Sequence, residues 1–254
     1  KIESGLMKMI TIGLGKQKGA DAAHSYGFKF MDEHVPEMAK IVLGKALVIF
    51  GLATVENAYD RPAKIEAVPA DRIFEREQEL LIEAKNLMPH IKFDPIDVLV
   101  VDEIGKDISG DGLDPNISGR FPTPYATGGI QATKVAVMRL TGKSHGNANG
   151  IGLADITTKA VFDEIALHKG YANALTSTVL DTVKIPMFLD TDKFAVKAAI
   201  KTSNAIDLTK VRLVRIKNTL EIGEIKISAS LLDEAEEKPD IEVVSKRFPY
   251  RFDD

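Results

Sequence analysis

Short apolar runs rich in β-branched residues recur along the chain and predict the strands of a sheet. They are bounded by glycine, aspartate, proline or other polar residues. Apolar runs of this kind, without polar alternation, are typical of strands buried on both faces. The six runs are residues 9–12, 46–50, 98–101, 135–138, 184–188 and 211–216.

Amphipathic patterns with a helical period lie between these runs. In residues 76–88 the apolar side chains fall on one stripe, opposite Glu and Lys. Residues 158–167 and 192–205 behave in the same way, and Asp190 or Thr191 is the expected N-cap of the second. The alternation of strands and helices predicts a layered α/β fold with a mostly parallel sheet and flanking helices.

Two long segments, residues 105–129 and 143–156, follow neither period. They hold nine glycines, and scattered apolar residues predict that both segments are ordered. Because long ordered loops are often functional, we expect glycine-rich active-site loops that line a ligand crevice at the strand ends. A boundary near two prolines gives expected domains at residues 1–92 and 93–254.

Polar residues in these two segments are the first candidates for chemistry. The first contains GKDISGDGLDPN, with Lys106, Asp107 and Asp111 on a glycine-rich backbone. An EF-hand begins with similar oxygen spacing, but its closing glutamate is replaced here by Ser118, so no calcium site is predicted. The second contains SHGNANG, in which His145 can donate or accept directional hydrogen bonds. Asx-turns at a solvated surface remain an alternative explanation of both.

Composition limits the classes of partner. The chain has 254 residues, of which 44% are hydrophobic, and this is enough for a sizeable core. Its formal charge of −4 gives no general basic field, so we expect neither nucleic acid nor an anionic membrane as a partner. The count of cysteines is zero, which excludes thiolate catalysis and favours a cytoplasmic location.

A glycine motif near the start of the chain suggests one enzyme class. Gly13, Gly15 and Gly19 form G-x-G-x-x-x-G after a predicted strand, similar to a dinucleotide-binding fingerprint. That fingerprint requires an acidic residue at the end of a second strand, and Asp32 and Glu33 lie at the right distance in a segment without a strand pattern. An NAD(P)- or nucleotide-dependent oxidoreductase without nickel is therefore one alternative.

The same stretch, SGLMKMITIGLGKQKGADAAH, resembles part of the nickel-dependent lactate racemase family. In that family a Ser-Gly-Gly-x-Lys segment is followed by a histidine, and here His24 lies sixteen residues after Lys8. Further stretches that resemble one branch of the family are GLGKQKGA, ISGDG, DPN and HGNANGIGLAD. The resemblance implies a nickel-pincer nucleotide attached covalently to Lys8, with nickel bound by His24. Planar nickel suits sulfur, carbon and imidazole ligands.

The resemblance also implies roles for other residues. The glycine turn would face the cofactor phosphate, through Gly13, Gly15, Lys16 and Lys18. The reaction would be racemisation or epimerisation of a small 2-hydroxy acid by hydride transfer from C2, which makes the enzyme an isomerase. A proton must leave the substrate hydroxyl, and the candidates for that catalytic step are His145, Asp107 and Asp111. The candidates for binding the substrate carboxylate are Lys106 and Arg120.

Family members carry two acid–base histidines upstream of the lysine segment, so we expect this chain to be a fragment. Residues 1–92 would then be the end of the cofactor-anchoring domain, and residues 93–254 the C-terminal α/β domain. The missing N-terminal part would be a partner, and the fragment alone would be inactive. Apolar surface exposed without that part would also allow the chain to form a homo-oligomer. A non-catalytic ligand-binding relative is the remaining alternative.

Overall fold

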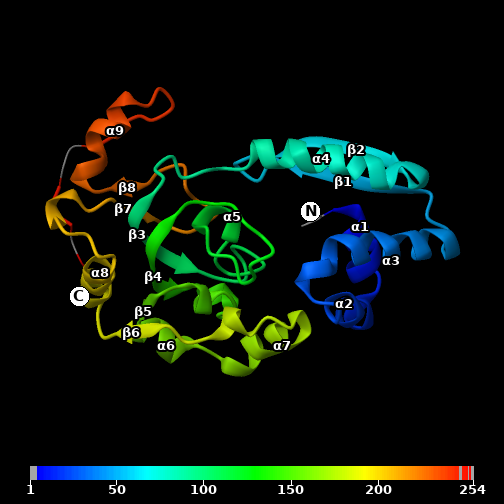
Figure 1. Ribbon diagram of the computed structural model, residues 1–254, viewed down its shortest axis with the longest axis horizontal. Coiled ribbons are helices and arrows are strands. Elements are labelled where there is room, and N and C mark those ends of the chain that lie inside the picture. Colours follow the sequence, from blue (N-terminus) through cyan, green and yellow to red (C-terminus); the bar gives the residue numbers. More distant parts are fainter. Residues whose placement is uncertain (1–4, 246–247, 251, 253–254) are drawn as a thin grey trace. The chain divides into compact units, whose positions relative to one another are not determined.

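The computed structural model describes residues 5–245, 248–250 and 252 (Figure 1). The chain forms two compact units. Of the described residues, the first unit contains those up to Pro89 together with Thr176–Thr178, and the second contains the others from His90 onward. Ser4, the first residue of the racemase-like segment, lies outside the described residues.

The first unit combines helices with a β-hairpin. Its core is formed by Met7, Ile10, Val35, Ala39, Val55, Val68, Ile73 and Leu80. In chain order the elements are helix α1 (Leu6–Lys8), the π-helical η1 (Met9–Gly13), α2 (Lys16–His24), the 3-10 helix η2 (Phe28–Phe30), α3 (Met31–Lys45), strands β1 (Phe50–Glu56) and β2 (Pro62–Pro69), η3 (Ala70–Arg72) and α4 (Ile73–Leu87). Strands β1 and β2 are antiparallel and pair only with each other among the described residues.

The second unit is built on a six-stranded sheet in the order β6-β5-β4-β3-β7-β8. All neighbouring strands are parallel except β7 and β8, so the predicted α/β fold with a mostly parallel sheet is confirmed. The strands are β3 (Ile96–Ile104), β4 (Ala132–Leu140), β5 (Ile156–Thr158), β6 (Met187–Leu189), β7 (Leu213–Ile216) and β8 (Lys226–Ile227).

Helices cover both faces of this sheet (Figure 1). The helices that follow His90 in the described chain are α5 (Pro115–Ser118), η4 (Gly142–Ser144), η5 (Ile151–Leu153), α6 (Lys159–Glu164), α7 (Leu167–Ser177), η6 (Leu180–Val183), α8 (Asp192–Thr202), η7 (Leu208–Lys210), η8 (Ala229–Leu231) and α9 (Leu232–Glu237). Along β3, Val98 and Val100 pack in the core under α8, whereas Leu99 and Val101 pack in the core on the opposite face. Burial on both faces explains why the strand sequence shows no polar alternation.

Helix α8 confirms the predicted N-cap. The Oγ1 atom of Thr191 accepts a hydrogen bond from the backbone N–H of Phe194 at 3.3 Å, so Thr191 rather than Asp190 caps the helix. The helix ends at Thr202, three residues before the predicted end. Helix α4 matches its predicted range closely, whereas α6 covers only part of residues 158–167.

Two predicted strands of the first unit are wrong. Residues 9–12 are helical, and Met7 and Ile10 are buried on one side of the α1–η1 helix, which is a helical and not a strand spacing. The hydroxyl of Thr11 donates to the carbonyl of Met7 at 3.0 Å, a bond that a helical backbone makes available to threonine. Residues 46–49 precede the hairpin, and β1 begins only at Phe50.

Candidate functional site

The residues predicted to hold a cofactor lie on the first helices of the first unit. Lys8 ends α1 with an exposed side chain, and Lys16 and Lys18 lie exposed in the first turn of α2. His24 is the last residue of α2 and is half-buried. All four therefore lie on the helices α1 and α2, which η1 and a short turn connect, rather than on a strand and a loop.

The ring of His24 is held in an orientation that suits a metal ligand. Its Nδ1 atom lies 2.7 Å from the carbonyl oxygen of Ala20, one turn earlier in α2. A carbonyl can only accept a hydrogen bond, so Nδ1 donates to it, and Nε2 is the nitrogen left to bind a metal. Imidazoles that bind metals commonly have their second nitrogen fixed in this way. Among the described residues, no group of three or more His, Asp or Glu side chains forms a metal cluster.

The glycines of the motif have a packing role that the sequence did not predict. A Cβ atom placed on Gly15 would lie 2.1 Å from the carbonyl oxygen of Thr11, and one on Gly19 would lie 2.4 Å from the same oxygen. Both glycines thus allow α2 to pack directly on the backbone of η1. At Gly13 the nearest group is the flexible side chain of Met9, which could move aside.

The predicted strand–glycine loop–helix context is therefore wrong. Lys16 has φ of +52°, which marks the change of direction between η1 and α2, and no loop cradles a ligand there. Asp32 and Glu33 lie in the first turn of α3 and do not follow a second strand. The structural context of a dinucleotide fingerprint is consequently absent from the described part of this unit.

In the second unit, the two long glycine-rich segments pack against each other. They follow the carboxyl ends of the neighbouring parallel strands β3 and β4. A Cβ on Gly112 would lie 2.0 Å from the carbonyl oxygen of Asn149, and one on Gly150 would lie 1.7 Å from that of Asp111. Both glycines have positive φ, +73° and +95°. The segments are therefore ordered against each other, at the edge of the sheet where α/β proteins commonly bind ligands.

Asp107 is held within a network of hydroxyl groups at this edge. Its Oδ1 atom accepts hydrogen bonds from the Oγ1 of Thr141 at 2.5 Å and from the Oγ of Ser144 at 3.2 Å. The Thr141 hydroxyl holds the pKa of Asp107 below its ordinary value, with a smaller contribution from Ser144 and Lys143. A carboxylate of this kind is ionised near neutral pH, so it can accept a hydrogen bond or a proton but is a poor general acid.

Lys106 lies next to this network and bonds to it through its backbone. Its backbone N–H donates to the Oγ of Ser144 at 3.2 Å, and its ammonium group donates to the carbonyl oxygen of Gly110. Partial removal from water lowers the pKa of Lys106, and the nearby charge of Asp111 opposes that shift. The structure thus brings together three predicted residues, Lys106, Asp107 and Asp111, in one loop.

His145 lies on the neighbouring segment, immediately after η4. Its backbone adopts the left-handed conformation, with φ of +50°, and its carbonyl oxygen accepts a hydrogen bond from the Nζ of Lys169 at 2.7 Å. The side chain is exposed. Ser144 donates a hydrogen bond to Asp107, and His145 is the next residue in the sequence. The backbone of His145 is therefore joined directly to this network.

Arg120 makes its contacts at the other end of the strands, away from the Asp107 network. Its Nη2 atom donates to Asp155 Oδ2 at 2.7 Å and to the carbonyl oxygens of Ala132 and Thr133 at 3.0 and 3.1 Å. Asp155 Oδ2 also accepts the backbone N–H of Val135 at 2.8 Å. These contacts lie where β4 begins, whereas Lys106 and His145 follow the ends of β3 and β4. The structure therefore separates Arg120 from the other predicted substrate residues, and its contacts join the starts of β4 and β5.

A third segment at the same edge was not predicted. It follows β7, the other neighbour of β3, and contains the buried residues Asn218 and Thr219. The Nδ2 of Asn218 donates to Glu103 Oε1 at 3.0 Å, and the Oγ1 of Thr219 accepts the backbone N–H of Asp114 at 3.2 Å. The sequence signal was a polar Asn-Thr pair directly after an apolar strand.

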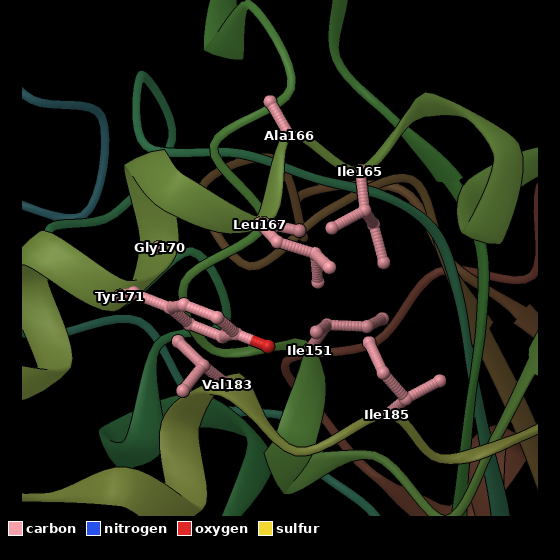
Figure 2. Close-up of a pocket in the computed structure, with 9 residues that line it drawn as sticks. Ile151, Ile165, Ala166, Leu167, Gly170, Tyr171, Val183 and Ile185 are labelled. Carbon is pink, nitrogen blue, oxygen red and sulfur yellow. The ribbon is translucent and has the colours of Figure 1, made fainter.

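A small apolar pocket lies beside the second glycine-rich segment. Figure 2 shows the side chain of Tyr171 extending toward Ile151, with Ile165, Leu167 and Ile185 around them. Its volume is about 10 Å³, which is room for about one water molecule. The pocket cannot hold an organic substrate in this conformation.

Comparison with known proteins found no relative of this chain. No family model matches the chain, and neither curated proteins nor solved structures yielded a match. Over the described residues, every helix is too short or too polar to cross a bilayer. Function is therefore argued from the residues themselves.

Proposed function

We propose that the chain belongs to an isomerase that racemises or epimerises a 2-hydroxy acid, with a nickel-pincer nucleotide on Lys8 and nickel bound by His24. The observation that carries the proposal is the 2.7 Å contact between His24 Nδ1 and the carbonyl of Ala20. It leaves Nε2 as the ligating nitrogen of a histidine that the family resemblance already selects.

The residues fit such a cofactor in part. An exposed lysine at the end of α1 is accessible to acylation, and the half-buried imidazole of His24 offers one metal ligand. The glycines do not fit a phosphate cradle, because the Cβ positions of Gly15 and Gly19 face the carbonyl of Thr11. Contact with the phosphate then depends on the exposed ammonium groups of Lys16 and Lys18.

When bound, the cofactor would supply the site that accepts and returns hydride. The chain itself would supply charge and proton acceptors. Lys106 is the candidate for pairing with the substrate carboxylate, since Arg120 is already bound to Asp155. Asp107, with its lowered pKa, is suited to accept a hydrogen bond from the substrate hydroxyl, and the exposed imidazole of His145 is the candidate for proton transfer.

Mass spectrometry tests the proposal directly. The protein is co-expressed with the pincer-biosynthesis proteins, supplied with nickel, and analysed both intact and as peptides. We expect a nucleotide-sized adduct on Lys8 that disappears in Lys8→Ala and persists in Lys45→Ala, a variant of an exposed lysine at the end of α3. Folded protein whose Lys8 stays unmodified under these conditions would contradict the racemase mechanism and favour a non-catalytic ligand-binding protein.

A further inference from the structure

Glu77 is a buried carboxylate of α4 that contacts the backbone just before Lys8. Both elements belong to the first unit (Figure 1). The residue is 4% exposed, and its Oε2 accepts the backbone N–H of Met7 at 2.7 Å. The backbone N–H of Leu6 makes a second hydrogen bond to the same carboxylate. The first amides of a helix have no partner within it, so a side chain from α4 satisfies the start of α1.

The backbone at Gly5 packs closely against this carboxylate. Gly5 has φ of +133°, and a Cβ placed there would lie 2.5 Å from Glu77 Oε1 and 2.6 Å from its Cδ. The carbonyl oxygen of Gly5 accepts the N–H of Met9 at 3.0 Å, which closes the turn that contains Lys8. A side chain at position 5 and the carboxylate of Glu77 therefore cannot both be accommodated without movement.

Stability alone does not explain a carboxylate at this position. Its Oε1 is buried and is the one such side-chain atom of the described residues that has no hydrogen-bond partner. Burial raises the pKa of Glu77, and the two backbone N–H groups offset part of that shift. An apolar side chain would avoid this desolvation cost, but it could not hold the amides of Leu6 and Met7.

We propose that Glu77 is a positioning residue that fixes the segment 5–9 and thereby holds Lys8 where it receives and presents the cofactor. The proposal rests on the proposed function, since Lys8 has a cofactor to receive and present only if that function holds. Glu77 would act through the backbone and would not touch the substrate.

The test compares three changes at this contact with a matched control. Glu77→Met removes the acceptor, Glu77→Gln keeps one acceptor oxygen, and Gly5→Ala inserts a methyl group against an unchanged carboxylate. Glu75→Met is the control, since Glu75 is an exposed carboxylate on the same helix that pairs only at the surface, with Arg72 at 3.3 Å. Two quantities are measured for each: amide hydrogen exchange of residues 5–9 without cofactor, and the fraction of Lys8 that carries the adduct after co-expression.

We expect exchange in residues 5–9 to rise about tenfold or more in Glu77→Met and Gly5→Ala, while Glu77→Gln and Glu75→Met stay within about threefold of the wild type. Adduct occupancy should fall in the same two variants and be retained in the other two. Unchanged exchange in folded Glu77→Met or in Gly5→Ala would overturn the proposal, and so would normal adduct occupancy despite faster exchange. If Glu77→Met does not fold, Gly5→Ala alone decides.

The two proposals fail in distinguishable ways. Exchange is measured without cofactor, so a rise confined to residues 5–9 shows that Glu77 holds the segment whatever Lys8 carries. An unmodified Lys8 in the wild type would instead remove the proposed function and, with it, the reason for positioning. Normal adduct on wild-type protein together with normal exchange in the variants would remove the role of Glu77 alone.

Discussion

The carbonyl oxygen of Asp111 lies 1.7 Å from the point where a side chain on Gly150 would begin. Asp111 belongs to the segment after β3 and Gly150 to the segment after β4. The contact therefore packs the backbones of two loops that are far apart in sequence directly against each other. The arrangement of Lys106, Asp107 and His145 at this edge of the sheet depends on that backbone contact.

Alanine at Gly150 should therefore loosen both loops. The backbone there has φ of +95° and no room for a methyl group, so we expect Gly150→Ala to lower the free energy of unfolding by about 2 kcal/mol or more. Gly110 lies beside Asp111 in the segment after β3, with nothing within 4 Å of its Cβ position, and Gly110→Ala should change stability by about 0.5 kcal/mol or less. Urea unfolding of the two variants makes the comparison, and equal effects would show that the close contact is not formed.

Arg120 should be a structural residue. Its ion pair with Asp155 is about three-quarters buried, with side-chain exposures of 27% and 26%. Arg120→Lys cannot reproduce all of its contacts and should destabilise the protein by about 1–3 kcal/mol without weakening substrate binding. Thermal unfolding and KM are the measurements. A raised KM at unchanged stability would instead support the substrate role that the sequence predicted.

The pKa of Asp107 should affect stability in acid. Because the folded protein lowers this pKa below its ordinary value, ionised Asp107 contributes stability above the ordinary aspartate range, and that contribution is lost as the pH falls through the lower folded value. Thr141→Val removes the strongest hydrogen bond and should raise the pKa toward its ordinary value, about 3.9. Carboxyl NMR titration follows the shift directly, and an unmoved pKa would show that Thr141 does not cause it.

Glu77 should make stability depend on pH in the opposite direction to Asp107. Its folded pKa is raised, so its contribution to stability is present below the ordinary glutamate pKa and is lost as the pH rises through the folded value. The charged groups that line the groove beside it are Asp32 on α3 and Lys85 on α4. Relative to Glu77→Gln, wild-type protein should lose stability as the pH rises above the ordinary glutamate pKa, about 4.3. Parallel pH profiles of the two proteins, obtained by urea unfolding, would contradict this.

The sequence predicted the second unit better than the first, for physical reasons. Strands such as residues 98–101 and 135–138 are buried on both faces, and this condition leaves an unmistakable apolar run. Residues 9–12 carry a similar run, but the segment is too short to separate a strand from a buried helical turn. Helix α3 was missed because Pro36 and Gly44 interrupt its pattern.

The candidate site was predictable in its residues but not in its contacts. Lys106, Asp107, Asp111 and His145 were found from their glycine-rich loops. The role of Arg120 depends on Asp155, thirty-five positions away, and the role of Gly15 depends on the packing of α2 on Thr11. Asp155 cannot be identified from local sequence, since its contact with Arg120 arises only once the strands have packed. Thr11 is only four positions from Gly15, but their contact requires the helical backbone of η1, which the sequence did not predict.

Nickel content is the most direct test of the central claim that Lys8 and His24 together hold a cofactor. Adduct and nickel are measured on the same purified protein for the wild type, for His24→Ala, and for His34→Ala as a histidine control from α3. We predict about one nickel per Lys8 adduct in the wild type and in His34→Ala, and an adduct without nickel in His24→Ala. Nickel that remains at wild-type level in His24→Ala, with the adduct in place, would contradict the account.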